Sequence, residues 1–384
     1  MFNFNLCDKN CQFDEKGLYI KVGEEKYSLK ENSSSLFDQI IYLKFNSMCN
    51  LRCTYCFQKN DQNYDCNRKI EIQELEKIIT RPNSKIILFG GEPFIDYNID
   101  ILTKLVNIAN EKSIKFNVFT NGCCTDLMKQ FIKKNSRCFE SFTITLDGPE
   151  PIHNKMRILP NGNSFTKIIE NLKWMLTENI SVFIQVNINN FNIRYVDQLC
   201  SRLLELFPKH NLNIILNRIL HEEFQIDNKT FLKESLNLIK KYRRINFIVN
   251  LPTLIKLKNA LLNYGVDRRR CAINNTKIYD FQSRKIYSCP QNINTIIGEF
   301  YDGKEKLNFI EIDNYLNYTS KNTEKCRECR FLYFCSYGCL LDRDVQAYNC
   351  RNDTEREIQF ILDNFEYFIG YDLALYIKNI HELL

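Results

Sequence analysis

The chain has 384 residues, of which 44% are hydrophobic and 26% charged, a balance that excludes a disordered or fibrous protein. Its 52 basic and 46 acidic residues are both spread along the sequence, so the net charge of +6 does not indicate a nucleic-acid partner. No stretch approaches about 18 uncharged apolar residues, and the first ten residues do not resemble a signal peptide. We therefore expect a cytoplasmic protein of roughly two or three domains.

The predicted elements begin with a hairpin in residues 1–37, formed by Gly17–Lys21 and Tyr27–Lys30 around Gly23. From residue 38, short runs rich in Ile, Val and Phe alternate with helical patterns. The predicted strands are Gln39–Asn46, Lys85–Phe89, Lys115–Phe119, Ser141–Leu146, Ser181–Ile188 and Leu212–Asn217. The predicted helices are Ile70–Thr80, Ile99–Glu111, Thr125–Lys134, Phe165–Thr177, Val196–Leu206 and Lys229–Lys241. These β/α units predict an α/β domain over residues 38–262, with a parallel sheet that is open or curled into a partial barrel.

The pattern changes after about residue 263. Residues 263–350 contain short strands, loops and seven cysteines, and they lack the apolar periodicity that a large core needs. A small module held together by bound metal is the simplest interpretation. Residues 351–384 return to helical periodicity.

Cysteine is the most informative residue of the sequence. An odd total of 17 in a reducing cytoplasm does not form a disulfide framework, so we expect metal or cluster ligation. The first group, Cys49-x3-Cys53-x2-Cys56, follows the first predicted strand directly. Three thiolates can hold a [4Fe–4S] cluster and leave one iron open, whereas a zinc site would need a fourth ligand from elsewhere.

Further motifs follow the next three predicted strands. They are Gly90-Gly91-Glu92-Pro93, then Thr120-Asn121-Gly122, then Thr145-Leu146-Asp147-Gly148-Pro149 with His153 and Arg157 beyond it. Each motif alone could be a turn. Because chemistry gathers at the carboxyl ends of strands in folds of this kind, their joint occurrence predicts one site.

This series of motifs resembles the radical S-adenosylmethionine (SAM) superfamily over about residues 40–190. The resemblance implies a partial (β/α)6 TIM-like barrel, a [4Fe–4S] cluster on Cys49, Cys53 and Cys56, and SAM bound to the open iron. It also implies SAM contacts from Tyr55, Gly90, Gly91, Glu92, Thr145 and Arg157. Cleavage of SAM would yield a 5′-deoxyadenosyl radical that abstracts hydrogen from carbon. We expect His153 to be a satisfied loop residue.

A second cysteine group, Cys326-x2-Cys329-x5-Cys335-x3-Cys339 with Cys350, follows Cys271 and Cys289. Its spacing resembles the SPASM extension of radical SAM enzymes, except that Arg284 stands where that pattern has glycine. The resemblance implies two auxiliary [4Fe–4S] clusters, three clusters in all. Cys271, Cys289 and Cys339 would hold the first, and Cys326, Cys329, Cys335 and Cys350 the second.

Several cysteines have no assigned place in this scheme. The substrate or a further residue would complete the first auxiliary cluster. We expect Cys123, Cys124, Cys138 and Cys200 to be ordinary thiols, and Cys7 and Cys11 to be two free thiols.

Proteins with this extension mostly modify ribosomally made peptides or protein side chains. Our leading hypothesis is a peptide maturase that joins a cysteine sulfur to a carbon as a thioether. Carbon–carbon crosslinking and epimerisation are the alternatives. Sulfatase maturation is disfavoured because Pro290 stands where those enzymes have aspartate, and Lys277 near where they have a further cysteine. A non-enzymatic zinc or redox-sensing protein would leave the other motifs unexplained.

The expected partners are a precursor peptide and a reductase or a flavodoxin- or ferredoxin-type electron donor. We expect no nucleic acid and no membrane among the partners. The 37 residues before the core are too few for a complete winged-helix leader-binding domain, so the core, the C-terminal helix or a separate protein would recognise the leader.

Overall fold

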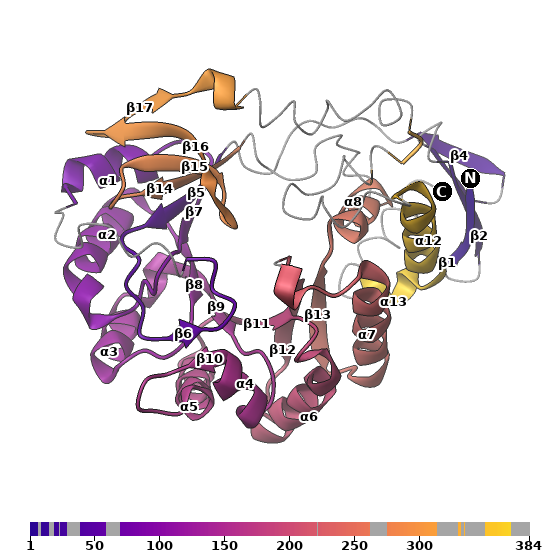
Figure 1. The fold of residues 1–384 in the computed structure, drawn as a ribbon, viewed down its shortest axis with the longest axis horizontal. Helices are drawn as coiled ribbons and strands as arrows, with labels where there is room; N and C mark the ends of the chain where they lie inside the picture. The colour runs from indigo at the N-terminus through magenta and orange to yellow at the C-terminus, as the bar shows by residue number, and fades with distance from the viewer. Residues whose placement is uncertain are drawn as a thin grey trace.

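A computed structural model describes residues 1–6, 9–14, 19–22, 24–28, 39–58, 70–220, 222–261, 275–312, 329–331, 334 and 350–369. Within these ranges a large parallel sheet curves around the centre of the molecule, with helices outside it (Figure 1). The parallel strands are β5 (Gln39–Lys44), β7 (Ser84–Leu88), β8 (Phe116–Thr120), β9 (Phe139–Thr145), β11 (Val182–Ile188), β12 (Leu212–Arg218) and β13 (Ile245–Asn250). The predicted α/β class with a curved parallel sheet is confirmed.

The outer helices lie between successive strands. They are α1 (Ile72–Ile79), α2 (Ile99–Lys112), α3 (Asp126–Lys134), α4 (Glu150–Met156), α5 (Ser164–Thr177), α6 (Val196–Leu206), α7 (Asn228–Lys241) and α8 (Pro252–Leu261). Single 3-10 turns are η1 (Asp96–Asn98), η2 (Ser136–Cys138), η3 (Ile193–Tyr195) and η4 (Glu222–Phe224). All six predicted strands and all six predicted helices are present, with ends within two residues. Strand β13, helix α4 and helix α8 were not predicted.

Side-chain caps explain why several helices begin where they do. Thr125, Asn163 and Asp227 precede α3, α5 and α7, and each side-chain oxygen accepts a hydrogen bond from a backbone N–H in the first turn. Such caps satisfy donors that have no partner inside the helix. The strands then bury every second residue against these helices, as Val182, Ile184 and Val186 do on β11.

The sheet continues beyond the barrel into the cysteine-rich region. Strand β14 (Thr276–Asp280) pairs in parallel with β5, and three antiparallel strands follow it: β15 (Lys285–Cys289), β16 (Asn292–Tyr301) and β17 (Lys304–Leu307). A buried ion pair joins Lys44 of β5 to Asp280 of β14, with Nζ and Oδ2 3.0 Å apart. Residues 276–307 are therefore built directly onto the edge of the parallel sheet.

The amino-terminal sheet lies beside the last helices (Figure 1). Its four antiparallel strands are β1 (Phe2–Leu6), β2 (Lys9–Asp14), β3 (Tyr19–Val22) and β4 (Glu25–Ser28), and β3 and β4 form a hairpin in the region where the sequence predicts one. Helix α12 (Cys350–Asp363) packs on β1, and α13 (Phe365–Ile369) follows it. Aromatic rings fill this junction, for example Phe4 against Phe365.

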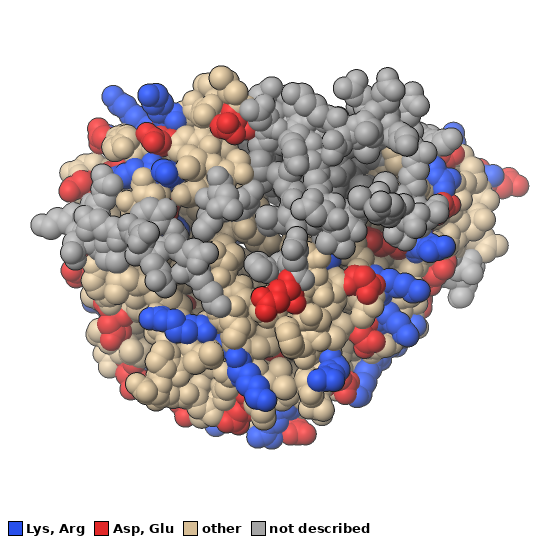
Figure 2. All heavy atoms as spheres, viewed as in Figure 1, with Lys and Arg blue, Asp and Glu red and all other residues tan. Residues whose placement is uncertain are grey.

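The surface carries both signs of charge. Basic and acidic side chains are interspersed over the described part of the face in Figure 2, as their spread along the sequence suggests. Among the described helices, none is both long and apolar enough to cross a membrane.

Candidate active site

The three cysteines of the first group lie in one loop, residues 45–56, called here the cysteine loop. Cys49, Cys53 and Cys56 are all half-buried in it. The short strand β6 (Arg52–Cys53) pairs with β10 (Arg157–Ile158), so that Cys53 lies opposite Arg157. The Thr54 N–H also donates to the carbonyl oxygen of Met156 at 2.8 Å. These bonds hold the cysteine loop against the segment that follows β9.

Two donors point at the Cys49 sulfur. The Leu51 backbone N–H lies 3.4 Å from Sγ and the Asn121 amide nitrogen 3.6 Å from it. Burial raises the pKa of the Cys49 thiol to about 11 and also raises the pKa of Cys53, so metal coordination would have to displace these protons. In the described ranges, no three His, Cys, Asp or Glu side chains surround one ion position. A cubane differs from such a site because its cysteines bind separate irons.

Gly90 and Gly91 follow β7 and pack against neighbouring backbone and side-chain atoms. Their φ angles are +84° and +53°, values that side chains with a Cβ rarely adopt. A Cβ on Gly91 would lie 2.4 Å from the carbonyl oxygen of Met48. The next N–H, of Glu92, donates to that same oxygen at 2.7 Å. Glycine is therefore needed for the close approach of this turn to the cysteine loop.

The Glu92 carboxylate is buried and accepts hydrogen bonds from three protein donors. Oε1 accepts from the Phe94 N–H at 3.0 Å and from the Thr120 hydroxyl at 2.7 Å, and Oε2 accepts from the Asn121 N–H at 2.6 Å. Burial raises the pKa of Glu92, and these donors oppose that shift. Glu92 thus ties the end of β7 to the end of β8.

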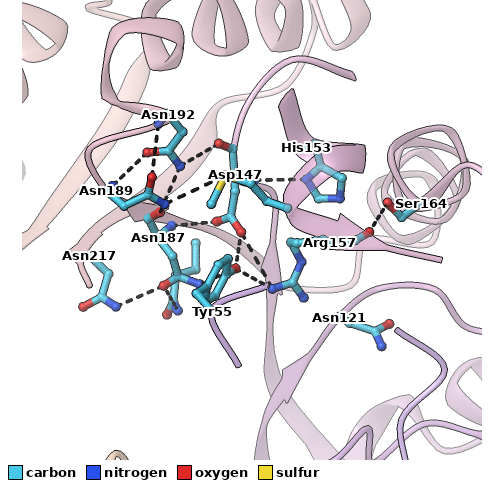
Figure 3. A network of polar contacts seen from close by, with 12 residues as sticks. Tyr55, Asn121, Asp147, His153, Arg157, Ser164, Asn187, Asn189, Asn192 and Asn217 are labelled. Carbon is cyan, nitrogen blue, oxygen red and sulfur yellow. Dashed lines mark hydrogen bonds and ion pairs between the residues drawn. The ribbon is translucent and has the colours of Figure 1, made fainter. Parts of the chain in front are cut away.

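A buried polar network, called here the Tyr55 network, connects the cysteine loop to β9, β10 and β11 (Figure 3). The Tyr55 hydroxyl donates to Asp147 Oδ2 and accepts from Arg157 at 2.8 Å and from the Asn187 amide at 3.3 Å. Asp147 Oδ1 accepts from the Asn187 backbone N–H at 2.8 Å. Burial raises the pKa of Asp147, while the Arg157 guanidinium 3.8 Å away lowers it. The network fixes the ring of Tyr55, which lies between Cys53 and Cys56 in the sequence.

His153 contacts this network through the backbone of Asp147. The Asp147 backbone N–H donates to its Nδ1 at 3.1 Å, and the ring is fully buried. Burial and, to a smaller extent, the Arg157 charge hold the pKa of His153 well below its usual value, so the imidazole is neutral. We expected a satisfied loop residue, but His153 lies on α4, because Pro149 and Glu150 begin a short helix there, and its buried Nε2 has no hydrogen-bond partner among the described residues.

The remaining predicted SAM contact, Thr145, is the last residue of β9 and pairs in register with Gln185. Of the polar residues at this site, sequence reasoning missed the side chain of Asn187. It also named Asn121 only as part of a turn motif. Asn121 directly follows β8 and Asn187 lies near the carboxyl end of β11, positions that could have indicated them. Their bonds to Tyr55 and Cys49 depend on which strands are neighbours.

The second cysteine group is described only in part. Cys289 ends β15, Cys329 is half-buried and Cys350 is the first residue of α12. Four predicted ligands lie outside the described residues: Cys271, Cys326, Cys335 and Cys339.

The unassigned thiols that the structure describes are buried. Cys123, Cys124, Cys138 and Cys200 are at most 5% exposed. Cys11 is buried on β2, and Cys7 lies outside the described residues.

Known proteins are similar to this chain in sequence and in fold. Residues 43–203 match the Radical SAM superfamily profile. The chain is 26% identical to the cysteine-type anaerobic sulfatase-maturating enzyme of Clostridium novyi (strain NT) over 349 residues, which are 80% of this chain and 89% of that protein. Among solved structures, native anSMEcpe with bound AdoMet has a TM-score of 0.63 at 18% identity, covering 90% of this chain and 100% of that one.

Streptococcus suis SuiB bound to precursor peptide SuiA is also similar, with a TM-score of 0.58 at 16% identity, covering 80% of this chain and 73% of that one. These structural similarities concern the fold. The family match covers the cysteine loop and the three later motifs that meet around it. The chain therefore contains a region, residues 43–203, that matches the Radical SAM superfamily.

Proposed function

We propose that this protein is a radical SAM maturase that modifies a residue of a peptide substrate. The observation that carries this proposal is the meeting of four motifs at one edge of the sheet. The cysteine loop contacts the Gly90–Gly91 turn through Met48, and Tyr55 of the same loop bonds to Asp147 and Arg157. Similarity to a sulfatase-maturating enzyme over most of both chains supports a maturase.

The residues present fit a SAM-binding cluster. Three half-buried thiols in one loop supply the donors, and the buried Nε of Arg157 has no hydrogen-bond partner among the described residues. Such an atom suits an anionic group such as the SAM carboxylate. When bound, a [4Fe–4S] cluster and SAM together supply a carbon radical that takes hydrogen from unactivated carbon.

Each predicted contact residue then has a role. Cys49, Cys53 and Cys56 would bind the cluster. The Gly90–Gly91 backbone and the Glu92 charge would hold the SAM amino group, and the Tyr55 ring, fixed by its hydroxyl bonds, would flank the adenine. Thr145, at the end of β9, would add a polar contact.

The carboxyl-terminal part would carry the two auxiliary [4Fe–4S] clusters on the seven cysteines assigned above. We propose domains at residues 1–37, 38–262, 263–350 and 351–384. Cys289 and Cys329 are half-buried thiols, an exposure that suits cluster ligands.

We propose thioether formation as the reaction, with a ribosomally made precursor peptide as substrate and a reductase or a flavodoxin- or ferredoxin-type protein as electron donor. In forming one carbon–sulfur bond, the hydrogen atom of the carbon would go to the 5′-deoxyadenosyl radical and the thiol proton to solvent, and a proposed auxiliary cluster would take up the remaining electron. SuiB, which shares the fold, has been crystallised with a precursor peptide. Carbon–carbon crosslinking and epimerisation stay as alternatives.

Sulfatase maturation is the second candidate, because the match to the Clostridium novyi enzyme covers 89% of that protein. Two residues of this chain oppose it. Pro290 follows Cys289 where those enzymes have aspartate, and Lys277 on β14 pairs with Glu305 rather than supplying a thiol.

The first test is SAM cleavage. The anaerobically purified protein with its clusters, reduced with dithionite, should release 5′-deoxyadenosine, and Cys53→Ala should abolish that release. Cys200→Ala is the matched control, because Cys200 is buried on α6 away from the cysteine loop and should preserve cleavage. An inert wild-type protein with full iron content would refute the proposal.

The second test identifies the bond. A peptide encoded beside the gene would be co-expressed anaerobically with the enzyme. Its mass would be measured by mass spectrometry, and its free cysteines would be counted by alkylation. Loss of two hydrogens with loss of one free cysteine supports a thioether. The same loss with all cysteines free indicates a carbon–carbon bond. A mass that is unchanged in ordinary water but increases through deuterium uptake in heavy water indicates epimerisation. Oxidation of a cysteine in a sulfatase-derived peptide would favour the second candidate.

A further inference from the structure

The ends of three neighbouring strands carry a row of side-chain amides. Asn187, Asn217 and Asn250 are direct cross-strand partners on β11, β12 and β13. Asn250 donates to the Asn217 carbonyl at 2.8 Å, and Asn217 donates to the Asn187 carbonyl at 3.0 Å. Gln185, two residues earlier on β11, also donates to Asn187, at 2.8 Å. These four residues are called here the amide ladder.

The amide ladder leads to the candidate active site. Asn187 donates to the Tyr55 hydroxyl at 3.3 Å, so the bonds run in one direction from Asn250 to Tyr55 (Figure 3 shows the part from Asn217 inward). Side-chain exposure increases along the ladder, from Asn187, which is 8% exposed, through the half-buried Asn217 to the exposed Asn250. The ladder therefore connects the buried network to solvent.

On the face of β11–β13 that carries the amide ladder, none of the strand residues is charged, and the nearest charged pair, Asp147 and Arg157, lies in the Tyr55 network. On β11–β13 the residues that alternate with the helix-packed ones are Phe183, Gln185, Asn187, Asn213, Ile215, Asn217, Asn246, Ile248 and Asn250. Ile248 is 41% exposed, which is unusual for an apolar residue of a parallel strand. A charged group on this face would be desolvated without a partner of opposite sign among these nine residues.

The donors of the amide ladder match a polypeptide backbone. A primary amide has two N–H groups and one carbonyl. The bonds between ladder residues use one N–H of Asn217 and one of Asn250. The second N–H of each is suited to a peptide carbonyl, while Ile215 and Ile248 offer contact to small or apolar side chains. A substrate with many backbone carbonyls and no charge satisfies both features.

We propose that the amide ladder binds the backbone of an uncharged segment of the peptide substrate and holds its reacting residue beside Tyr55. This inference rests on the proposed function and adds the substrate class: a peptide segment whose residues next to the reaction site are neutral. The ladder residues are positioning residues, since they bind the peptide outside the reacting atoms.

The test measures retention of peptides on the immobilised enzyme carrying its clusters. The probes are two pools of acetylated, amidated heptapeptides with a central cysteine. Neighbouring positions vary among alanine, serine, asparagine and valine in the neutral pool, and among aspartate, glutamate, lysine and arginine in the charged pool. Mass spectrometry reads the retained members. The wild-type protein should retain the neutral pool about tenfold better, a ratio that corresponds to about one hydrogen bond.

Three variants distinguish an effect of the amide ladder on peptide retention from a general effect on folding. Asn217→Leu should lose about tenfold in neutral-pool retention because it removes two donors. Asn217→Asp should shift retention toward lysine- and arginine-containing members. Asn213→Leu is the matched control: it breaks a similar bond, from Asn246 to Asn213 at 2.9 Å, about 13 Å earlier along the strands, and should preserve retention.

Equal retention of both pools by the wild-type protein, retention of neither pool, or unchanged retention by both Asn217 variants would overturn the inference. Release of 5′-deoxyadenosine distinguishes the two proposals. If the protein cleaves SAM but shows no preference between the two peptide pools, only the amide-ladder inference is refuted. If the protein does not cleave SAM, the proposed function is refuted.

Discussion

Asn121 illustrates how one side chain links two strands to the cysteine loop. Its backbone N–H donates to Glu92, and its amide donates to Asn50 at 2.6 Å and lies 3.6 Å from the Cys49 sulfur. Hydrogen bonds to the sulfurs are among the factors that set the reduction potential of an iron–sulfur cluster. The position of Asn121 therefore bears on electron transfer as well as on folding.

We predict that Asn121→Ala makes the potential of the SAM-binding cluster more negative by roughly 40 mV, since one hydrogen bond of about 1 kcal/mol corresponds to that shift for one electron. A redox titration followed by electron paramagnetic resonance measures it. Asn117→Ala on β8 is the control, because Asn117 bonds to Ser141. Equal potentials for the two variants would contradict the prediction.

His153 predicts a pH dependence of stability. Its pKa in the folded protein is well below the usual 6.5, chiefly because of burial. The unfolded chain therefore binds a proton that the folded chain excludes, and this contribution to stability is lost as the pH falls below about 6.5.

His153→Asn retains an acceptor for the Asp147 N–H but does not titrate. We predict that its free energy of unfolding falls less than that of the wild type between about pH 7.5 and pH 5.5. Anaerobic thermal unfolding of both proteins at the two pH values provides the comparison. Parallel losses would show that another group is responsible.

At the scale of the elements, the turn between β14 and β15 has Arg284 at the position where the SPASM pattern has glycine. Arg284 has φ +61°, the left-handed conformation that glycine adopts easily, so the turn persists without glycine. Its guanidinium pairs with the buried Glu74 of α1 and lies 5.5 Å from the centre of the Phe300 ring. These contacts compensate for the backbone strain and fasten the hairpin that ends at Cys289 onto the barrel.

We predict that Arg284→Ala destabilises the protein by about 3–5 kcal/mol, because Glu74 is left buried without its partner. Arg284→Gly loses the same pair but should be about 1 kcal/mol more stable than Arg284→Ala, since only glycine adopts the positive φ without strain. Denaturant unfolding of both variants tests this order. If alanine were the more stable residue here, the strain argument would be wrong.

At the scale of the whole molecule, the amino-terminal sheet supports the cysteine-rich region. Phe13 of β2 is fully buried, and its ring lies edge-on to that of Phe334, 5.1 Å between centres. The Phe2 ring is tilted by 46° against that of Phe331, with 6.1 Å between their centres. Phe331 and Phe334 follow Cys329 in the sequence, so strands from the start of the chain pack against residues close to Cys329 along the chain.

We predict that Phe13→Ala costs about 3–5 kcal/mol and also lowers the iron content per chain. Phe116→Ala on β8 is the matched control, because that ring is equally buried but lies in the barrel. It should cost a similar amount of stability without the selective loss of iron. Equal iron content in the two variants would show that the amino-terminal sheet does not support the proposed auxiliary clusters.

Much of the fold could be predicted from local sequence patterns. The alternation of buried apolar residues and the spacing of the turns located six strands and six helices, because these patterns depend on neighbours along the chain. The segment Ile245–Asn250 was missed as a strand. Its place at the end of the sheet depends on pairing with β12, which is not visible in its own composition.

The sequence alone determined the family motifs, the order of the β/α units and the three cysteines of the first group, since spacing along the chain carries that information. Only the tertiary structure decided that Asn187 reaches Tyr55, that Asn121 reaches Cys49, and that Asn217 and Asn250 extend the row of amides. Those contacts join residues tens of positions apart. They exist because parallel strands bring their carboxyl ends to one edge of the sheet, and because strand order decides which ends are neighbours.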